Sequence, residues 1–373
     1  MKLTDFQLFC ILLLMVAPVA YLETPHTLVH ILFANSWLAV ITAVIPGLLL
    51  IQMYYYIITK SGRPFPQMLE EHLGKVAGKL LGLLYIPLFI LVCSYTLRLF
   101  IEFMKMNVLP ATPISVFIGV LLLVCWVAIK AGLETSARVL EIITIIGLTF
   151  GLIIVLLALA NNFHPARLLP IGYLNYRSLG QGTLLVASIV GKLMPVLALA
   201  FFIDDKKRSL GIMRWVVLVF IPVITLNTMA IIITRGIMPS LSQSFPVFSM
   251  VRLARIGAFI QNVDIFFIGV WILGIFGAVT IPWFMACYTT QQVFGLRNYR
   301  FAAAPTAMTI GILSIVISRN NLEVVIWSQK ITPYVYSFFF IVIPLLVFLV
   351  TLFKPMPASK SADSGDLANP TSA

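Results

Sequence analysis

Ten long apolar runs follow one another along this chain, and they restrict its fold more than any other feature. The runs fall near residues 5–32, 36–59, 80–106, 113–130, 137–160, 182–203, 212–235, 259–285, 300–318 and 332–353. A helix crosses the hydrocarbon core of a bilayer with about 20 apolar residues, which is close to the length of these runs. A barrel strand needs only about ten residues of alternating character. The sequence therefore predicts an all-α integral membrane protein of about ten transmembrane helices, with one membrane domain over residues 1–353.

Composition and charge agree with a membrane protein and exclude other classes. Hydrophobic residues make up 61% of the chain and charged residues 10%, whereas soluble domains carry about 25% charged residues. The net charge of +12 is not gathered into a basic block of the kind that binds nucleic acid. Lys and Arg favour the loops of one side by about two to one, which predicts that this side and both termini are cytoplasmic. Residues 354–373 have the composition of a disordered cytoplasmic tail.

Two of the runs are interrupted at similar depth. Pro18 and Pro25 fall inside the first run, and Gly191, with a proline four residues later, falls inside the sixth. Broken backbone is tolerated within a membrane where protein or a water-filled cavity satisfies its polar groups, so matched interruptions indicate a central binding site. We expect a five-plus-five inverted repeat of residues 5–160 and 182–353, with helices 1 and 6 broken. A pair of ordinary proline kinks is the alternative.

Charged side chains inside the predicted crossings are costly unless they are paired or hydrated. Glu23 lies at the first interruption and Lys192 at the interruption of the sixth run. We expect these two residues either to pair with each other or to flank a ligand. Arg98 and Glu102 lie four residues apart in the third run, and this spacing predicts an ion pair within one helix.

Residues typical of metal or catalytic chemistry are sparse. His26 and His30 have the spacing of two metal ligands on one helix face, but the sequence offers no second cluster to complete the coordination. The chain contains no P-loop, HExxH motif or nucleophile elbow. The four cysteines lie in apolar runs without CxxC spacing. We therefore expect no enzymatic activity, no cofactor and no metal site.

Four stretches carry a resemblance to a known family. They are residues 67–82 (QMLEEHLGKVAGKLLG), residues 245–257 (FPVFSMVRLARIG), the stretch through Asp264 to residue 276 (FFIGVWILGIF), and the basic hairpin at residues 297–305. Through these stretches the chain resembles the spore-germination permease family, the B subunits of nutrient germinant receptors. The resemblance runs along most of residues 4–353.

The resemblance implies a ten-helix inverted-repeat fold of the LeuT-like type, within the amino acid, polyamine and organocation superfamily. It implies that helices one, three, six and eight bind a small nutrient, commonly an amino acid, near the middle of the membrane. Together with Glu23 and Lys192, the expected ligand-binding residues are Ala20, Tyr21, Thr24, Tyr95, Ser188, Gly191, and residues 271–276, among them Trp271 and Gly274. The implied partners are membrane lipid, a larger membrane subunit and a lipoprotein, in the inner membrane of the dormant spore.

The first interruption departs from the pattern of related amino acid transporters, which often place a glycine-containing motif there to expose amides to a carboxylate. This chain has PVAYLETP instead, and Glu23 would repel an anionic group. A ligand with an exposed amine, or a sugar, remains compatible with that sequence. Three functions stay open: a ligand-sensing receptor subunit, a proton-coupled secondary amino acid transporter, and a membrane scaffold with an inactive pocket.

Overall fold

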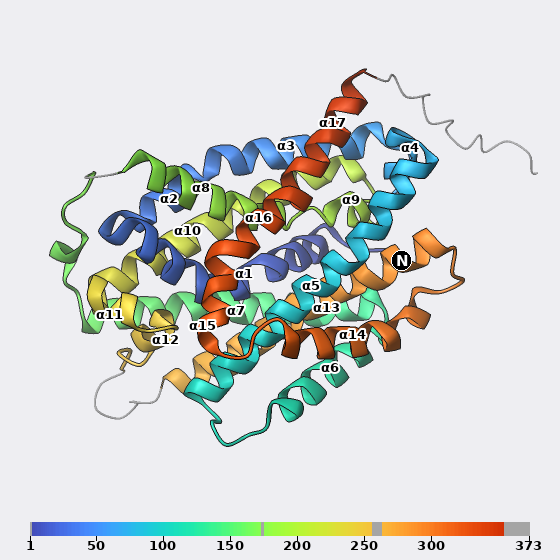
Figure 1. Cartoon of the computed structure of the whole chain (residues 1–373). Coiled ribbons are helices and arrows are strands. Elements are labelled where there is room, and N and C mark those ends of the chain that lie inside the picture. The colour runs from blue at the N-terminus through green and yellow to red at the C-terminus, as the bar shows by residue number, and fades with distance from the viewer. Residues whose placement is uncertain (1, 173–174, 256–262, 354–373) are drawn as a thin grey trace, which may run out of the picture.

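The structure, a computed structural model, describes residues 2–172, 175–255 and 263–353. Within these residues every regular element is helical, apart from one isolated bridge between Leu3 and Ile203. The helices pack side by side into a bundle (Figure 1). The predicted all-α class is therefore confirmed for the described part of the chain, whereas the predicted tail at 354–373 lies outside it.

The α-helices alternate with short 3-10 and π-helical turns. The α-helices are α1 (Asp5–Leu32), α2 (Ser36–Thr42), α3 (Val44–Lys60), α4 (Gln67–Leu73), α5 (Lys75–Asn107), α6 (Ile114–Ala131), α7 (Leu133–Asn161), α8 (Tyr176–Gly191), α9 (Val196–Leu199), α10 (Ser209–Arg235), α11 (Ile237–Ser242), α12 (Pro246–Val251), α13 (Asp264–Phe294), α14 (Ala303–Val316), α15 (Asn321–Ile326), α16 (Thr332–Ser337) and α17 (Ile343–Phe353). Two π-helical segments, η6 (Trp327–Ile331) and η7 (Phe338–Val342), join the last three of them into one long crossing.

Nine helical runs among the described residues are long and apolar enough to cross a membrane. The first, Asp5–Lys60, has 56 residues, more than twice the length of about 20 that one crossing needs. It contains α1 and α3, which α2 and the turn η1 (Phe33–Asn35) separate. The lengths are therefore compatible with about ten crossings, while the five-plus-five repeat stays a prediction.

Most predicted runs agree with the observed helices to within a few residues, but two differ. The eighth was expected at 259–285; residues 259–262 lie outside the described part of the chain, and α13, which covers Asp264–Phe294, continues nine residues beyond the expected end. The last was expected at 332–353, whereas the helical run covers Asn321–Phe353. In both cases the helix has polar residues at one end. Hydropathy identifies the part of a helix that lies in hydrocarbon and does not detect turns that continue beyond it.

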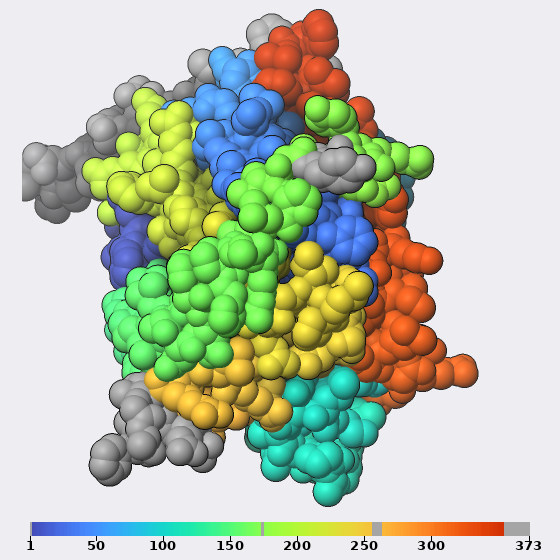
Figure 2. Space-filling view, turned by 90° about the vertical axis from the view of Figure 1, so that its left-hand side faces the viewer, coloured from blue at the N-terminus to red at the C-terminus, as the bar shows by residue number. Residues whose placement is uncertain are grey.

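The connections between helices gather at two opposite ends of the bundle. At one end Lys206 Nζ donates to the Ser61 carbonyl at 2.8 Å, and at the other Asn35 Nδ2 donates to the Pro170 carbonyl at 3.1 Å. The N-terminus and α4 lie toward the right of Figure 1, and α11 and α12 toward the left. Figure 2 looks onto that left-hand end, which α11 and α12 (yellow) and the green segment before α8 cover. That the N-terminal end faces the cytoplasm stays a prediction from the basic loops.

Helix α1 runs without a break through both of its prolines, so the predicted interruption of the first helix is wrong. Pro25 has no N–H to offer to the carbonyl of Tyr21, one turn earlier. The side-chain amide of Asn227 in α10 donates to that carbonyl instead, at 2.7 Å. Trp271 Nε1 in α13 donates to the nearby Pro18 carbonyl at 3.0 Å. A neighbouring helix therefore satisfies the carbonyl that Pro25 leaves free, and α1 stays helical.

The sixth crossing is interrupted as the sequence predicts. Helix α8 ends at Gly191, residues 192–195 form a turn, and α9 begins at Val196. The Tyr54 hydroxyl on α3 donates to the Gly191 carbonyl at 3.0 Å and also to the Phe340 carbonyl in η7. A Cβ on Gly191 would lie 3.0 Å from the Cβ of Phe340. The absence of a side chain at this position therefore lets α8 approach the last crossing closely.

Candidate functional site: a polar cavity beside the helix interruption

A small polar cavity lies between α1, α5, α8 and the last crossing. Its volume is about 30 Å³, which is room for about two water molecules. Its polar lining residues are Glu23, Thr24, Thr27, Tyr95, Ser188, Lys192, Ser328, Thr332 and Tyr336, and its apolar ones are Val16, Val19, Ala20, Leu185, Ile189 and Pro333. The cavity thus combines one acid, one base and several hydroxyl groups at the level of the interrupted helix.

The acidic residue of the cavity is Glu23 on α1. The Tyr95 hydroxyl, from α5, donates a hydrogen bond to the Glu23 carboxylate. Ser328, from η6, lies beside the same carboxyl group, and its hydroxyl is 3.2 Å from that of Thr27. Hydroxyl donors from two other crossings therefore compensate in part for the loss of water around this carboxylate.

The basic residue of the cavity is Lys192, which begins the turn between α8 and α9. Its side chain is buried, with an exposed fraction of 3%. The ammonium nitrogen lies 5.3 Å from the centre of the Tyr336 ring, within the range of a cation–π interaction. In the described part of the chain Lys192 makes no ion pair within 4.0 Å. Glu23 and Lys192 therefore line one cavity without forming a salt bridge with each other.

Six of the ten expected ligand-binding residues line this cavity, namely Ala20, Glu23, Thr24, Tyr95, Ser188 and Lys192. Gly191 lies behind the cavity, where its carbonyl accepts from Tyr54. Tyr21, Trp271 and Gly274 lie in a second, apolar cavity that another face of α1 lines. Trp271 and Gly274 both contact Pro18 there. The structure thus separates residues that the resemblance placed in one site.

Sequence reasoning missed the part of the cavity that the last crossing contributes. Ser328, Thr332 and Tyr336 belong to η6 and α16, and the predicted last crossing began only at residue 332. The signal was the polar stretch SQKITP at residues 328–333, next to an apolar run. The π-helical turn η6 overlaps that stretch, and π-helical turns within α-helices are frequently found at functional sites.

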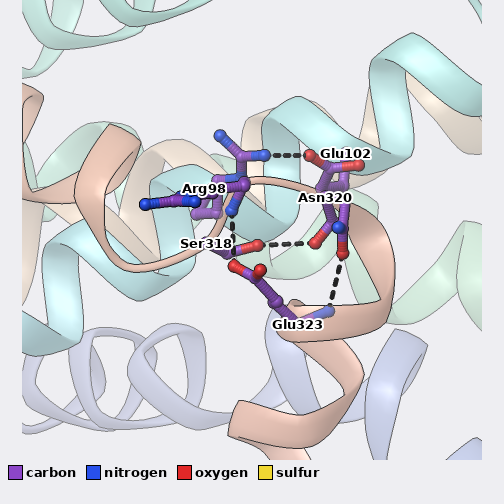
Figure 3. Close-up of polar contacts among 6 residues, drawn as sticks. Arg98, Glu102, Ser318, Asn320 and Glu323 are labelled. Atoms are coloured by element: carbon purple, nitrogen blue, oxygen red, sulfur yellow. Dashed lines mark hydrogen bonds and ion pairs between the residues drawn. The ribbon is translucent and has the colours of Figure 1, made fainter.

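The predicted ion pair between Arg98 and Glu102 is confirmed. Both side chains are buried in α5, with Arg98 only 2% exposed. Figure 3 shows this pair beside the turn between α14 and α15, where the Ser318 hydroxyl donates to the Asn320 carbonyl at 2.6 Å and the Glu323 amide donates to Asn320 Oδ1 at 3.0 Å. The pair lies one to two turns beyond Tyr95 and does not line the polar cavity. Its arrangement is that of a structural pair.

The two histidines of α1 contact each other, with His26 Nε2 and His30 Nε2 3.1 Å apart. Across residues 2–172, 175–255 and 263–353, no group of three or more His, Cys, Asp or Glu side chains is placed to hold a metal ion. The four cysteines are buried free thiols. The polar cavity beside Lys192 therefore remains the main candidate site.

Apolar crossings around an internal, charged cavity define an integral membrane protein with a central polar site. Comparison with known proteins identifies the family within this class. A family model described as spore germination protein matches residues 2–322. Spore germination protein KB of Bacillus subtilis (strain 168) is 24% identical over 362 residues, which cover 95% of this chain and 96% of that protein. Spore germination protein A2 of the same organism is 25% identical over 371 residues, covering 94% and 96%. The chain belongs to the spore-germination permease family.

Proposed function

We propose that this chain is the nutrient-sensing, transporter-like membrane subunit of a spore germination receptor. The observation that carries the proposal is the pair of buried, oppositely charged side chains, Glu23 and Lys192, that line one cavity without pairing. Buried acidic and basic side chains that are not joined in a salt bridge are costly inside a membrane protein, even where hydroxyl groups and an aromatic ring face them, and such residues are typical of ligand or ion sites. The resemblance to B subunits adds the setting: the inner spore membrane, cytoplasmic termini, a larger membrane subunit and a lipoprotein. No catalytic role is proposed.

The proposed ligand is a small amino acid. Its ammonium group would be bound by Glu23 and the hydroxyls beside it, and its carboxylate by Lys192 at the helix interruption. This orientation removes the difficulty that Glu23 poses for an anionic group, because the carboxylate lies at the other charged residue. The cavity of about 30 Å³ is smaller than any amino acid, so binding requires α1 and the turn after α8 to move apart. Ligand binding would thereby shift the population of an expanded state, which is how a sensor reports occupancy.

Direct binding tests this proposal. Calorimetry on the purified full chain in nanodiscs would compare alanine, its amine analogue ethylamine, its acid analogue propionate, a sugar and a nucleoside. We expect saturable binding of an amino acid and loss of binding with either analogue. The substitutions Lys192→Met and Glu23→Gln should each reduce affinity by at least tenfold, since each removes a charge that faces the ligand.

The matched controls are Lys105→Met and Glu141→Gln. Lys105→Met removes a positive charge, as Lys192→Met does, and Glu141→Gln removes a negative charge, as Glu23→Gln does. Neither control position lines the polar cavity, so binding should be unchanged. Unaltered affinity in Lys192→Met would contradict the proposal, and so would the absence of binding by every compound tested. Proteoliposomes that contain only this chain distinguish a sensor from a secondary transporter. Saturable, proton-dependent amino acid uptake would identify a transporter, whereas binding without flux would identify a sensor.

A further inference from the structure

A second cavity lies against another face of α1, between α1, α7, α10 and α13. Its volume is about 120 Å³, and apolar side chains form most of its wall. It shares no lining residue with the polar cavity, although α1 lines both: Ala20 and Glu23 belong to the polar cavity, whereas Ala17, Pro18 and Tyr21 belong to the apolar one. The two cavities are therefore chemically distinct spaces on two faces of one helix.

The wall of the second cavity includes three aromatic side chains and a buried hydroxyl group without a partner. Tyr21, Phe267 and Trp271 all line it, and the rings of Tyr21 and Phe267 are 6.1 Å apart. The Trp271 N–H is already used by the Pro18 carbonyl. The Tyr21 hydroxyl is buried and has no hydrogen-bond partner among the described residues. A buried hydroxyl without a partner costs free energy, which a ligand with one polar group would recover.

The size of the cavity fits a single aromatic ring. An apolar protein cavity of about 150 Å³ stays dry and binds benzene, and the space here is close to that volume. Water would find few polar partners in such a wall, so the cavity favours an apolar occupant.

The entrance of the cavity faces the region that hydrocarbon would occupy. Leu152 on α7 lines the cavity and is exposed, and Gly147 and Gly151 beside it are partly exposed. A Cβ on either glycine would meet no atom within 4 Å. These glycines, whose spacing is typical of close helix packing, therefore leave an opening instead of holding a neighbouring helix.

We propose that this cavity binds an uncharged single-ring aromatic molecule with one hydrogen-bonding group, which enters from the bilayer between α7 and its neighbours. The ring would pack among Tyr21, Phe267 and Trp271, and its polar group would bond to the Tyr21 hydroxyl. An occupant would contact the same helix that carries Glu23. The inference does not depend on the ligand of the polar cavity.

Fluorine NMR on the full chain in nanodiscs tests the proposal with 4-fluorobenzyl alcohol as the probe and empty nanodiscs as the background. We expect a saturable, protein-dependent signal. The substitution Gly147→Leu places a side chain at the entrance and should abolish that signal. Gly119→Leu is the matched control: Gly119 is also a helical glycine where an added Cβ would meet nothing within 4 Å, but it does not line the cavity, so the signal should persist.

The Tyr21 contact is tested separately. Tyr21→Phe should weaken 4-fluorobenzyl alcohol binding by about fivefold, the loss expected for one hydrogen bond, and leave 4-fluorotoluene binding unchanged. Equal saturable signals in Gly147→Leu and the unmodified chain would overturn the proposal. A signal that never saturates above the empty-nanodisc background would do the same, because it would mean that acyl chains occupy the cavity or that the probe only partitions into lipid.

Discussion

The first and sixth crossings differ although both carry prolines in the middle of an apolar run. Helix α1 passes through Pro18 and Pro25 as one helix of 28 residues, whereas the sixth crossing stops at Gly191 and resumes at Val196. The comparison shows that a proline within a membrane helix does not by itself decide whether the helix breaks. The neighbours decide, because they determine which backbone groups find partners.

The neighbours of α1 compensate for a missing bond, whereas the neighbours of the sixth crossing hold a tight turn in which amides bond to the carbonyl three residues earlier. Around α1, Asn227 donates to the one carbonyl that Pro25 leaves free. Around the sixth crossing, Tyr54 links the last carbonyl of α8 to η7, and Gly191 allows that close approach. Lys192, the first residue of this turn, lines the polar cavity.

Among substitutions that test the difference between the two crossings, we expect the largest loss of stability from Gly191→Val. The new side chain would overlap Phe340, whose Cβ lies 3.0 Å from the position of a Cβ on residue 191. Overpacking of this kind costs about 1–3 kcal/mol, and thermal unfolding of the purified chain should show a correspondingly lower Tm. Gly180→Val in the same helix is the control, since nothing lies within 4 Å there. A Tm as high as that of the control would show that α8 is not held against η7.

A comparable or smaller loss is expected from Asn227→Leu, which leaves the Tyr21 carbonyl without a donor. A buried carbonyl without a partner costs about 1–3 kcal/mol. Pro25→Ala restores an N–H one turn beyond Tyr21, so the double variant should recover most of the lost stability. This double-mutant cycle measures the coupling directly. If Pro25→Ala gives no recovery, Asn227 does not act through the carbonyl that proline leaves free.

The smallest effect is expected from Tyr54→Phe, which removes the hydroxyl that bonds to Gly191 and Phe340. The loss should be about 1 kcal/mol, with faster hydrogen exchange at residues 191–196 because the turn loses its anchor. Tyr299→Phe is the matched control, since that buried hydroxyl also donates to a backbone carbonyl, that of Ile129 on α6, at 3.5 Å, and Tyr299 does not line the polar cavity. Equal exchange at residues 191–196 in the two variants would remove Tyr54 from this role.

Much of the fold could be predicted because it depends on local pattern. The apolar runs located the crossings, the interruption at Gly191 was placed correctly, and the spacing of Arg98 and Glu102 predicted their ion pair. The helical residues 321–331 were missed because polar side chains, above all the run SQK at residues 328–330, interrupt their apolar pattern. They include Ser328, which lines the polar cavity.

The candidate site was predicted only in part, because α1 has more than one face. Ala20, Glu23 and Thr24 line the polar cavity, whereas Tyr21 lines the apolar one. If the helix were interrupted here, these positions could not be assigned to helix faces. In a continuous helix each residue is rotated by about 100° from the one before it, so neighbouring residues lie on different faces. The separation of Tyr21 from Glu23 therefore follows from the continuity of α1.

The sequence by itself determined that the chain crosses a membrane, where most crossings lie, and which charged residues must be accommodated inside them. These properties follow from hydropathy and spacing, which act over a few turns of helix. Only the tertiary structure decided that α1 stays intact through its prolines, and that Glu23 and Lys192 line one cavity without forming a salt bridge. The physical reason is that the effect of each local feature depends on a group far away in the chain. The free carbonyl of Tyr21 is satisfied by Asn227, and the missing side chain of Gly191 matters because Phe340 packs against that position.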